Sequence, residues 1–219
     1  MLLGREQERD EIDRALARAR SGSSATLALV GEAGIGKTAL LDYAAEHVDG
    51  MQLLRARGIE SEAQIPFASL LELLRPAVPM LERIPGPQAV ALEGAFALRP
   101  GPAQDRFAVG AATLSLLAAY AEQGPVAELL DDVHWLDESS AQALLFAFRR
   151  LVADPIAVLL AARDDEPSVL FEADLPAIRI GGLSNDEAAA HSCWRPPATP
   201  GKRWCSSAPP LRWASTWRR

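Results

Sequence analysis

The spacing of apolar residues divides residues 6–180 into alternating helices and strands. Ile12 and Leu16 lie four positions apart in a strongly charged stretch, so residues 6–20 are predicted to form an amphipathic helix. Short apolar runs are typical of strands that are buried on both faces of a sheet. Such runs occupy residues 26–30, 126–130 and 156–162, and weaker candidates occupy residues 51–57 and 177–180.

Helical patterns fill the segments between these strands. Residues 38–47 and most of residues 64–123 are predicted to be helical, and residues 184–190 begin a further helix. Another helix is predicted from Asp137 to near Ala153, with Ser139 and Gln142 at the spacing of a capping box. The alternation predicts an α/β fold in three layers. About five mostly parallel strands would be covered by helices on both faces, with a helical insert at 64–123.

The composition narrows the classes of function. The chain has 219 residues, 49% of them hydrophobic, which is enough for one α/β domain with a real core. A net charge of −7 argues against the basic face that nucleic-acid binding needs, so we expect no direct contact with nucleic acid. Charges begin at Arg5, which argues against a signal peptide. The longest weakly polar run, residues 108–121, is too short to span a membrane. A cytoplasmic protein without a membrane segment is expected.

The segment 191–219 differs from the rest of the chain. It holds both cysteines, Cys193 and Cys205, four of the five tryptophans and six basic residues, but no acidic residue. It shows neither a helical nor a strand period. One interpretation is a basic tail that binds a partner or nucleic acid. The favoured interpretation is a segment that was not selected to fold, such as a shifted reading frame, which leaves residues 1–190 as the domain.

The strongest chemical signal is the sequence Gly-x-x-x-x-Gly-Lys-Thr from Gly31 to Thr38. It follows an apolar strand and opens a helix, which is the context of a phosphate-binding P-loop and disfavours a plain glycine-rich turn. We expect the Lys37 ammonium to reach the β- and γ-phosphates of ATP and the Thr38 hydroxyl to bind Mg²⁺. The predicted cofactor-binding residues of this loop are Gly31, Glu32, Ala33, Gly34, Ile35, Gly36, Lys37, Thr38 and Ala39.

A second signal is the pair of acids that ends the strand at 126–130. Carboxylates there would lie beside the Mg²⁺ and the attacking water. Asp131 is the predicted Mg²⁺ ligand, and Asp132 is predicted to orient or deprotonate the water, which makes it catalytic together with Lys37. Glu128 is out of place in a buried strand, so we expect it to be partly exposed or paired with an arginine.

Arg163 directly follows the strand at 156–162. Because the carboxyl ends of strands face the ligand in open α/β sheets, Arg163 is predicted to sense the γ-phosphate as a third catalytic residue. The alternative is a solvated arginine that pairs with Asp164 or Asp165. His134 is interpreted as a loop residue.

With these motifs in view, the chain resembles the nucleotide-binding module of the large ATP-binding LuxR-type transcriptional regulators. These belong to the signal-transduction ATPases with many domains, close to the AAA+ and origin-recognition ATPases. The resemblance covers about residues 2–190. The matching segments, in order, are residues 3–8, 31–38, 56–58 with 65–70, 131–137 and 159–163.

The resemblance implies a P-loop NTPase fold in which the P-loop strand is central to a five-stranded parallel sheet. It implies that Arg5 lies near the adenine and ribose and that Arg163 is the sensor arginine. ATP binding and slow hydrolysis would switch a regulator between resting and active, often oligomeric, states. Such regulators continue with a helical lid, a sensor region and a helix-turn-helix. None of these is recognisable here, so those domains are expected partners in the parent architecture.

Three functions remain open from the sequence. The first is an ATP-binding switch module that hydrolyses ATP slowly. The second is a fragment that binds ATP without turnover. The third, a small P-loop phosphotransferase, is disfavoured because it needs an arginine-rich lid and the insert at 64–123 has few basic residues.

Overall fold

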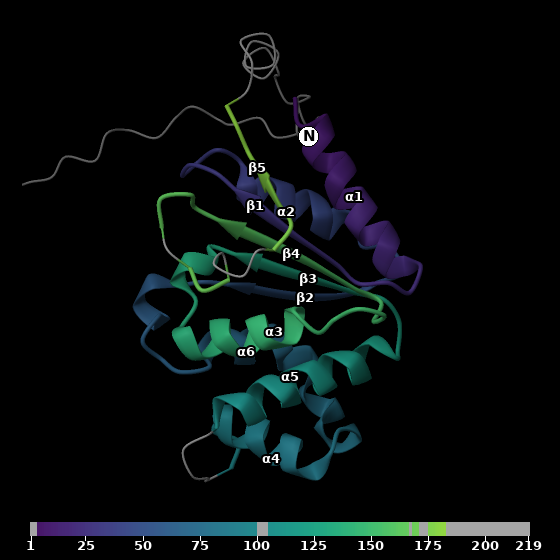
Figure 1. The fold of residues 1–219 in the computed structure, drawn as a ribbon, viewed down its shortest axis with the longest axis vertical. Helices are drawn as coiled ribbons and strands as arrows, with labels where there is room; N and C mark the ends of the chain where they lie inside the picture. Colours follow the sequence, from purple (N-terminus) through teal and green to yellow (C-terminus); the bar gives the residue numbers. More distant parts are fainter. Residues whose placement is uncertain (1–3, 100–104, 167, 171–174, 183–219) are drawn as a thin grey trace, which may run out of the picture.

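A parallel sheet of five strands forms the centre of the molecule (Figure 1). The computed structural model describes residues 4–99, 105–166, 168–170 and 175–182. The strand order is β2-β3-β4-β1-β5, so β4 is the middle strand and the P-loop strand β1 lies between β4 and β5. This corrects the central place that the resemblance implied for β1. The strands are β1 Ala25–Val30, β2 Gln52–Arg57, β3 Val126–Asp131, β4 Ile156–Ala162 and β5 Ala177–Arg179.

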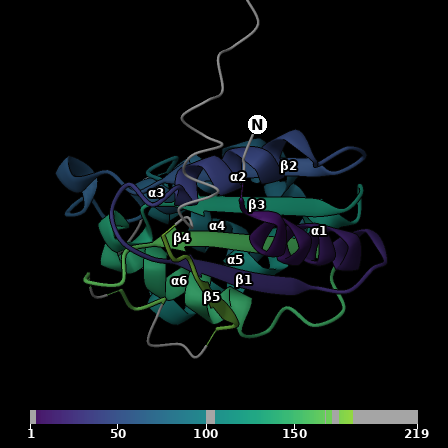
Figure 2. The same ribbon diagram turned by 90° about the horizontal axis from the view of Figure 1, so that it is seen from above.

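Two layers of helices cover the sheet, as the apolar pattern predicts (Figures 1 and 2). The amphipathic helix α1 (Glu6–Arg20) and the helix α2 (Lys37–Glu46) cover one face, where they pack against Leu129 and Leu159. The opposite face is covered by α3 (Ala68–Leu74) and α6 (Glu138–Phe148). Beyond them lie α5 (Arg106–Ala121), α4 (Gly86–Ala95) and the 3-10 segment η2 (Arg75–Arg83). Short 3-10 turns, η1 (Glu60–Glu62) and η3 (Val133–Trp135), precede α3 and α6.

The start of α6 differs from the prediction. Asp137 is its N-cap and accepts a hydrogen bond from the Ser140 N–H, so the capping box expected at Ser139 and Gln142 is wrong. The Gln142 side chain instead donates to the carboxylate of Glu138 on the helix surface. The helix also ends at Phe148, five residues before Ala153. The helix expected at 184–190 and the segment 191–219 lie outside the described residues, and the domain boundary at 190 stays a prediction.

Glu128 is the main exception to the apolar core. It is 0% exposed, and neither carboxylate oxygen has a hydrogen-bond partner among the described residues, so the expected exposure or arginine pairing is wrong. The physical reason is the place of β3 inside the sheet, because Glu128 stands in register between Leu54 of β2 and Val158 of β4. Burial raises the pKa of the Glu128 carboxyl to about 8. It is therefore mostly protonated at neutral pH.

Candidate nucleotide-binding site

The loop between β1 and α2 has the backbone that a phosphate-binding loop needs. Gly34 and Gly36 have φ values of 76° and 107°, a region that L side chains rarely adopt. Gly31 is required for space, because a Cβ there would lie 2.7 Å from the carbonyl oxygen of Ile180. The chain after β5 runs against this loop, and the Ile180 N–H donates to the Val30 carbonyl over 2.6 Å. The loop leads straight into α2, whose N-terminus faces the site with its partial positive charge.

Lys37, the first residue of α2, turns back under the loop. Its Nζ donates to the carbonyl oxygens of Gly31 at 2.8 Å and Glu32 at 2.7 Å, and the residue is only 7% exposed. Burial lowers the pKa of the Lys37 ammonium, while the nearby charge of Asp132 opposes this shift. The Lys37 ammonium is thus held against the loop backbone, at the carboxyl end of the sheet where Asp131 and Asp132 lie.

Thr38 and Asp131 join the loop to strand β3. The Thr38 hydroxyl donates to Oδ2 of Asp131 over 2.8 Å, and Oδ1 of Asp131 accepts the N–H of Asp132 at 2.9 Å. Asp131 is 2% exposed. A hydroxyl and a carboxylate are the oxygen donors that Mg²⁺ prefers, so this pair fits the ion that accompanies ATP. Within the residues that the structure describes, no group of three or more His, Cys, Asp or Glu side chains could hold a metal ion.

Asp132 is held by an arginine that the sequence analysis did not single out. Nε and Nη2 of Arg57 donate to Oδ2 of Asp132 at 3.0 and 2.7 Å. This hydrogen bond raises the pKa of the Arg57 guanidinium. Arg57 ends β2, and β2 pairs with β3 so that Arg57 stands opposite Asp131. The sequence does place Arg57 at the end of a predicted strand. Its contact with Asp132, however, depends on β2 lying next to β3.

Arg163 follows β4 and faces the same edge of the sheet. It makes no ion pair with Asp164 or Asp165 within the described ranges, so the alternative of a paired surface arginine is not observed. Asp164 instead lies 3.7 Å from Nη1 of Arg179. The charge of Arg163 is close enough to lower the pKa of the Lys37 ammonium.

One cavity of about 460 Å³ brings Lys37 and Thr38 together with Arg57, Asp132 and Arg163, and Asp131 is not among its lining residues. Its walls come from the P-loop, from α2 and from the carboxyl ends of β2, β3 and β4, which is where ligands bind in open α/β sheets. A triphosphate is of the size that such a cavity accepts. The lining residues are Ala33, Gly34, Gly36, Lys37, Thr38, Ala39, Asp42, Arg57, Asp132 and Arg163.

A comparison with protein families agrees with this fold and site. A family model described as an AAA ATPase domain matches residues 1–160. The chain belongs to the AAA ATPase domain family. No curated protein sequence matches it significantly.

A solved structure shares this fold. A chain in the structure of Drosophila ORC bound to DNA is similar to this AAA ATPase domain with a TM-score of 0.53 and 14% identity. The match covers 85% of this chain and 44% of that chain, and at this identity it shows a shared fold alone. C. elegans PCH-2 is similar with a TM-score of 0.45 and 14% identity, over 81% of this chain and 43% of that one. The AAA ATPase domain thus spans less than half the length of either chain.

Arg5 contacts the P-loop of the AAA ATPase domain from outside the cavity. Its Nη2 donates to the Ile35 carbonyl over 3.1 Å, and its Nη1 pairs with Oε1 of Glu8 at 2.9 Å. Arg5 is 6% exposed. In the structure it forms a hydrogen bond with the backbone of the loop. Its predicted contact with the adenine and ribose remains a proposal.

His134 is more enclosed than a loop residue would be. Neither ring nitrogen has a hydrogen-bond partner among the described residues, and both are shielded from solvent. Burial lowers the pKa of its imidazole, and the charge of Arg163 adds to this shift. It lies in the turn η3 directly after Asp132.

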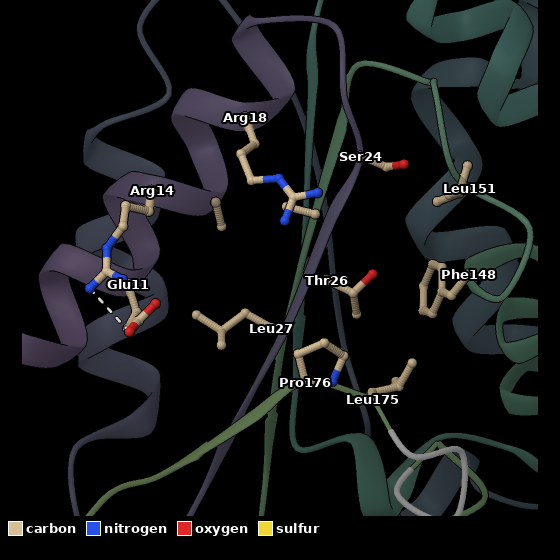
Figure 3. Close-up of a pocket in the computed structure, with 12 residues that line it drawn as sticks. Glu11, Arg14, Arg18, Ser24, Thr26, Leu27, Phe148, Leu151, Leu175 and Pro176 are labelled. Carbon is tan, nitrogen blue, oxygen red and sulfur yellow. Dashed lines mark ion pairs between the residues drawn. The ribbon is translucent and has the colours of Figure 1, made fainter.

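A second cavity, of about 450 Å³, lies at the opposite edge of the sheet (Figure 3). It surrounds the amino-terminal half of β1 and is lined by Arg14 and Arg18 of α1, by Thr26 and by Phe148 of α6. The P-loop follows the carboxyl end of β1, so this cavity is not part of the nucleotide site.

No helix among the described residues combines the length and the apolar composition that crossing a membrane requires.

Proposed function

We propose that the chain binds ATP with Mg²⁺ and acts as a nucleotide-dependent switch module of a bacterial-type transcriptional regulator. The observation that carries the proposal is the 2.8 Å hydrogen bond between Thr38 and Asp131. It brings the P-loop and the acidic end of β3 together beside one cavity. A P-loop alone binds phosphate, whereas the pair supplies oxygen ligands for the ion that ATP carries.

In this proposal each group has one task. The loop N–H groups and Lys37 bind the phosphates, while Thr38 and Asp131 hold Mg²⁺, which neutralises phosphate charge. Asp132 orients or deprotonates the attacking water, and Arg163 reaches the γ-phosphate from β4. Arg5 lies close to the base and sugar. The outcome is the attack of water on the γ-phosphorus, with release of ADP and phosphate.

The contact between Arg57 and Asp132 favours slow hydrolysis or binding without turnover. The Arg57 guanidinium donates twice to Oδ2 of Asp132, so it occupies one of the two oxygens that could accept a hydrogen bond from the attacking water. ATP would then be held for long periods, which suits a switch more than a metabolic enzyme. Phosphotransfer has little support, because the described lining of the cavity includes no residue from the insert at 64–123.

The role in a regulator extends the proposal beyond the site. It is supported by the resemblance to LuxR-type regulators, which covers the segment that the AAA ATPase family model matches. The module would work with C-terminal domains of the parent protein and with other copies of itself, without contacting nucleic acid directly.

Binding of ATP–Mg²⁺ to the whole chain tests the core of the proposal. Lys37→Ala should weaken the affinity at least about tenfold, because a buried cation on the phosphates is lost. Arg83→Ala is the control, since Arg83 is an exposed cation on η2 that pairs with Glu122. Equal affinity of the parent chain and Lys37→Ala would overturn the proposal.

A further inference from the structure

Two segments that follow neighbouring strands are joined near the nucleotide site. Residues 57–70 run from the end of β2 into α3, and residues 131–140 run from the end of β3 into α6. The Gly58 N–H donates to the Asp131 carbonyl over 2.9 Å, and beside it Arg57 pairs with Asp132. We call the contacts between residues 57–70 and 131–140 the clasp.

Asp137 closes the far end of the clasp with a single carboxylate. Its Oδ1 accepts the N–H groups of Phe67 at 2.8 Å and Ser140 at 2.9 Å, and its Oδ2 accepts the N–H of Ser69 at 3.2 Å. The Leu70 N–H donates to Oγ of Ser140 at 2.9 Å. Asp137 is 2% exposed. It therefore caps α3 and α6 together, one helix from each segment.

Asp132, between the two ends of the clasp, has a strained backbone. Its φ of 47° and ψ of 47° are left-handed, which a residue other than glycine keeps only where its surroundings hold it. Its carbonyl accepts the Trp135 N–H at 2.9 Å, and a Cβ at Gly58 would lie 2.2 Å from that carbonyl oxygen. Residues 133–136 thus pack against Gly58, and the hydrogen bonds of Asp137 hold the end of this loop.

We propose that Asp137 is a positioning residue for Asp132. By capping α3 and α6 with one carboxylate, it fixes residues 133–136 over Gly58 and keeps Asp132 in the conformation in which its carboxylate meets Arg57. Only the kinetic consequence of this inference rests on the proposed function. The structural consequence belongs to the chain without nucleotide.

The full chain with Asp137→Asn tests this role. Asparagine keeps one acceptor oxygen, which suffices to cap α6, but it turns an NH₂ group toward an N–H donor that the carboxylate had satisfied. Asp105→Asn is a matched control, because Asp105 caps α5 by accepting the Phe107 N–H at 3.0 Å. The readout is the NMR signal of the Arg57 Nε–H, assigned by its loss in Arg57→Lys.

We expect the Arg57 Nε–H to exchange with solvent faster in Asp137→Asn, by up to about fivefold, and at the parent rate in Asp105→Asn. The kcat for ATP should fall about tenfold, because the backbone that aims the Asp132 carboxylate at the water is lost together with its contact to Arg57. The KM should stay within about twofold, because the P-loop is unchanged. An unchanged Arg57 signal in a chain whose Ser69 amide has lost protection would overturn the proposal.

A second variant covers the case in which Asp137→Asn does not fold. Asp137→Ser keeps a short acceptor that can cap α6 but removes the carboxylate that accepts the Phe67 and Ser69 N–H groups of α3, so a rise in Arg57 exchange is expected again. An unchanged rate there would equally overturn the proposal. If the parent chain failed to bind ATP, the proposed function would fall, while the Arg57 measurement would still decide the role of Asp137.

Discussion

The hydroxyl of Thr38 donates to the carboxylate of Asp131 over 2.8 Å, although 93 residues separate the two along the chain. Each residue ends or begins an element at the same edge of the sheet. Thr38 lies in the first turn of α2, and Asp131 is the last residue of β3. This single contact makes one site out of two motifs.

The contact between Arg57 and Asp132 should restrain hydrolysis. The Arg57 side chain is 63% exposed, and an exposed ion pair is worth about 0.2–1 kcal/mol. Removing it with Arg57→Ala should therefore raise the rate of phosphate release from ATP by no more than about fivefold. Arg55→Ala is the control, because Arg55 lies on the same strand and pairs with Asp42 instead. A lower rate in Arg57→Ala alone would show that Arg57 assists the reaction.

Glu128 should make the stability of the fold fall as the pH rises. Its pKa is about 8 in the folded chain against an ordinary value of 4.5, so between these values the folded chain holds a proton that the unfolded chain has lost. The contribution of the protonated carboxyl to the free energy of unfolding is fully present below pH 4.5. It is lost as the pH approaches 8, at up to about 1.4 kcal/mol per pH unit.

Urea unfolding at several pH values measures this contribution. The free energy of unfolding should decline from pH 5 to pH 8 in the parent chain and in Glu122→Gln, whose site is exposed. It should decline much less in Glu128→Gln, because glutamine does not titrate. Parallel profiles for the parent chain and Glu128→Gln would contradict the burial of this carboxyl.

Gly58 should not tolerate a side chain. A Cβ there would lie 2.2 Å from the Asp132 carbonyl oxygen and 2.9 Å from the Trp135 carbonyl carbon, and both neighbours are backbone atoms. Gly58→Ala should therefore lower the free energy of unfolding by roughly 2 kcal/mol or more and weaken ATP hydrolysis. Gly86→Ala, at the start of α4 with open space around it, should be neutral or slightly stabilising. Thermal unfolding of both variants checks the difference.

Much of the fold is predictable from local pattern. The apolar period of residues 6–20 and the unbroken apolar run of residues 156–162 predict a helix and a strand with the bounds that the structure has. The cap of α6 is not predictable in this way, since Asp137, Ser139 and Ser140 are all plausible caps until backbone angles are known. The P-loop is equally local, since its glycines and lysine act within eight residues of chain.

The features that the sequence analysis missed depend on which strands are neighbours. Arg57 matters because β2 lies beside β3, and nothing in the residues of either strand specifies that pairing. Glu128 is buried because β3 is an interior strand with helices on both faces, whereas its sequence alone also fits a strand at the rim. Asp137 caps a second helix only because α3 returns to lie beside α6.

The affinity for ATP with and without Mg²⁺ tests the joined site most directly. Calorimetry on the parent chain should show ATP binding that Mg²⁺ strengthens at least about tenfold. In Thr38→Val, which keeps the shape of the side chain but removes the hydroxyl, that gain should be largely lost while binding of ATP alone persists. An equal gain from Mg²⁺ in the parent chain and in Thr38→Val would contradict the account.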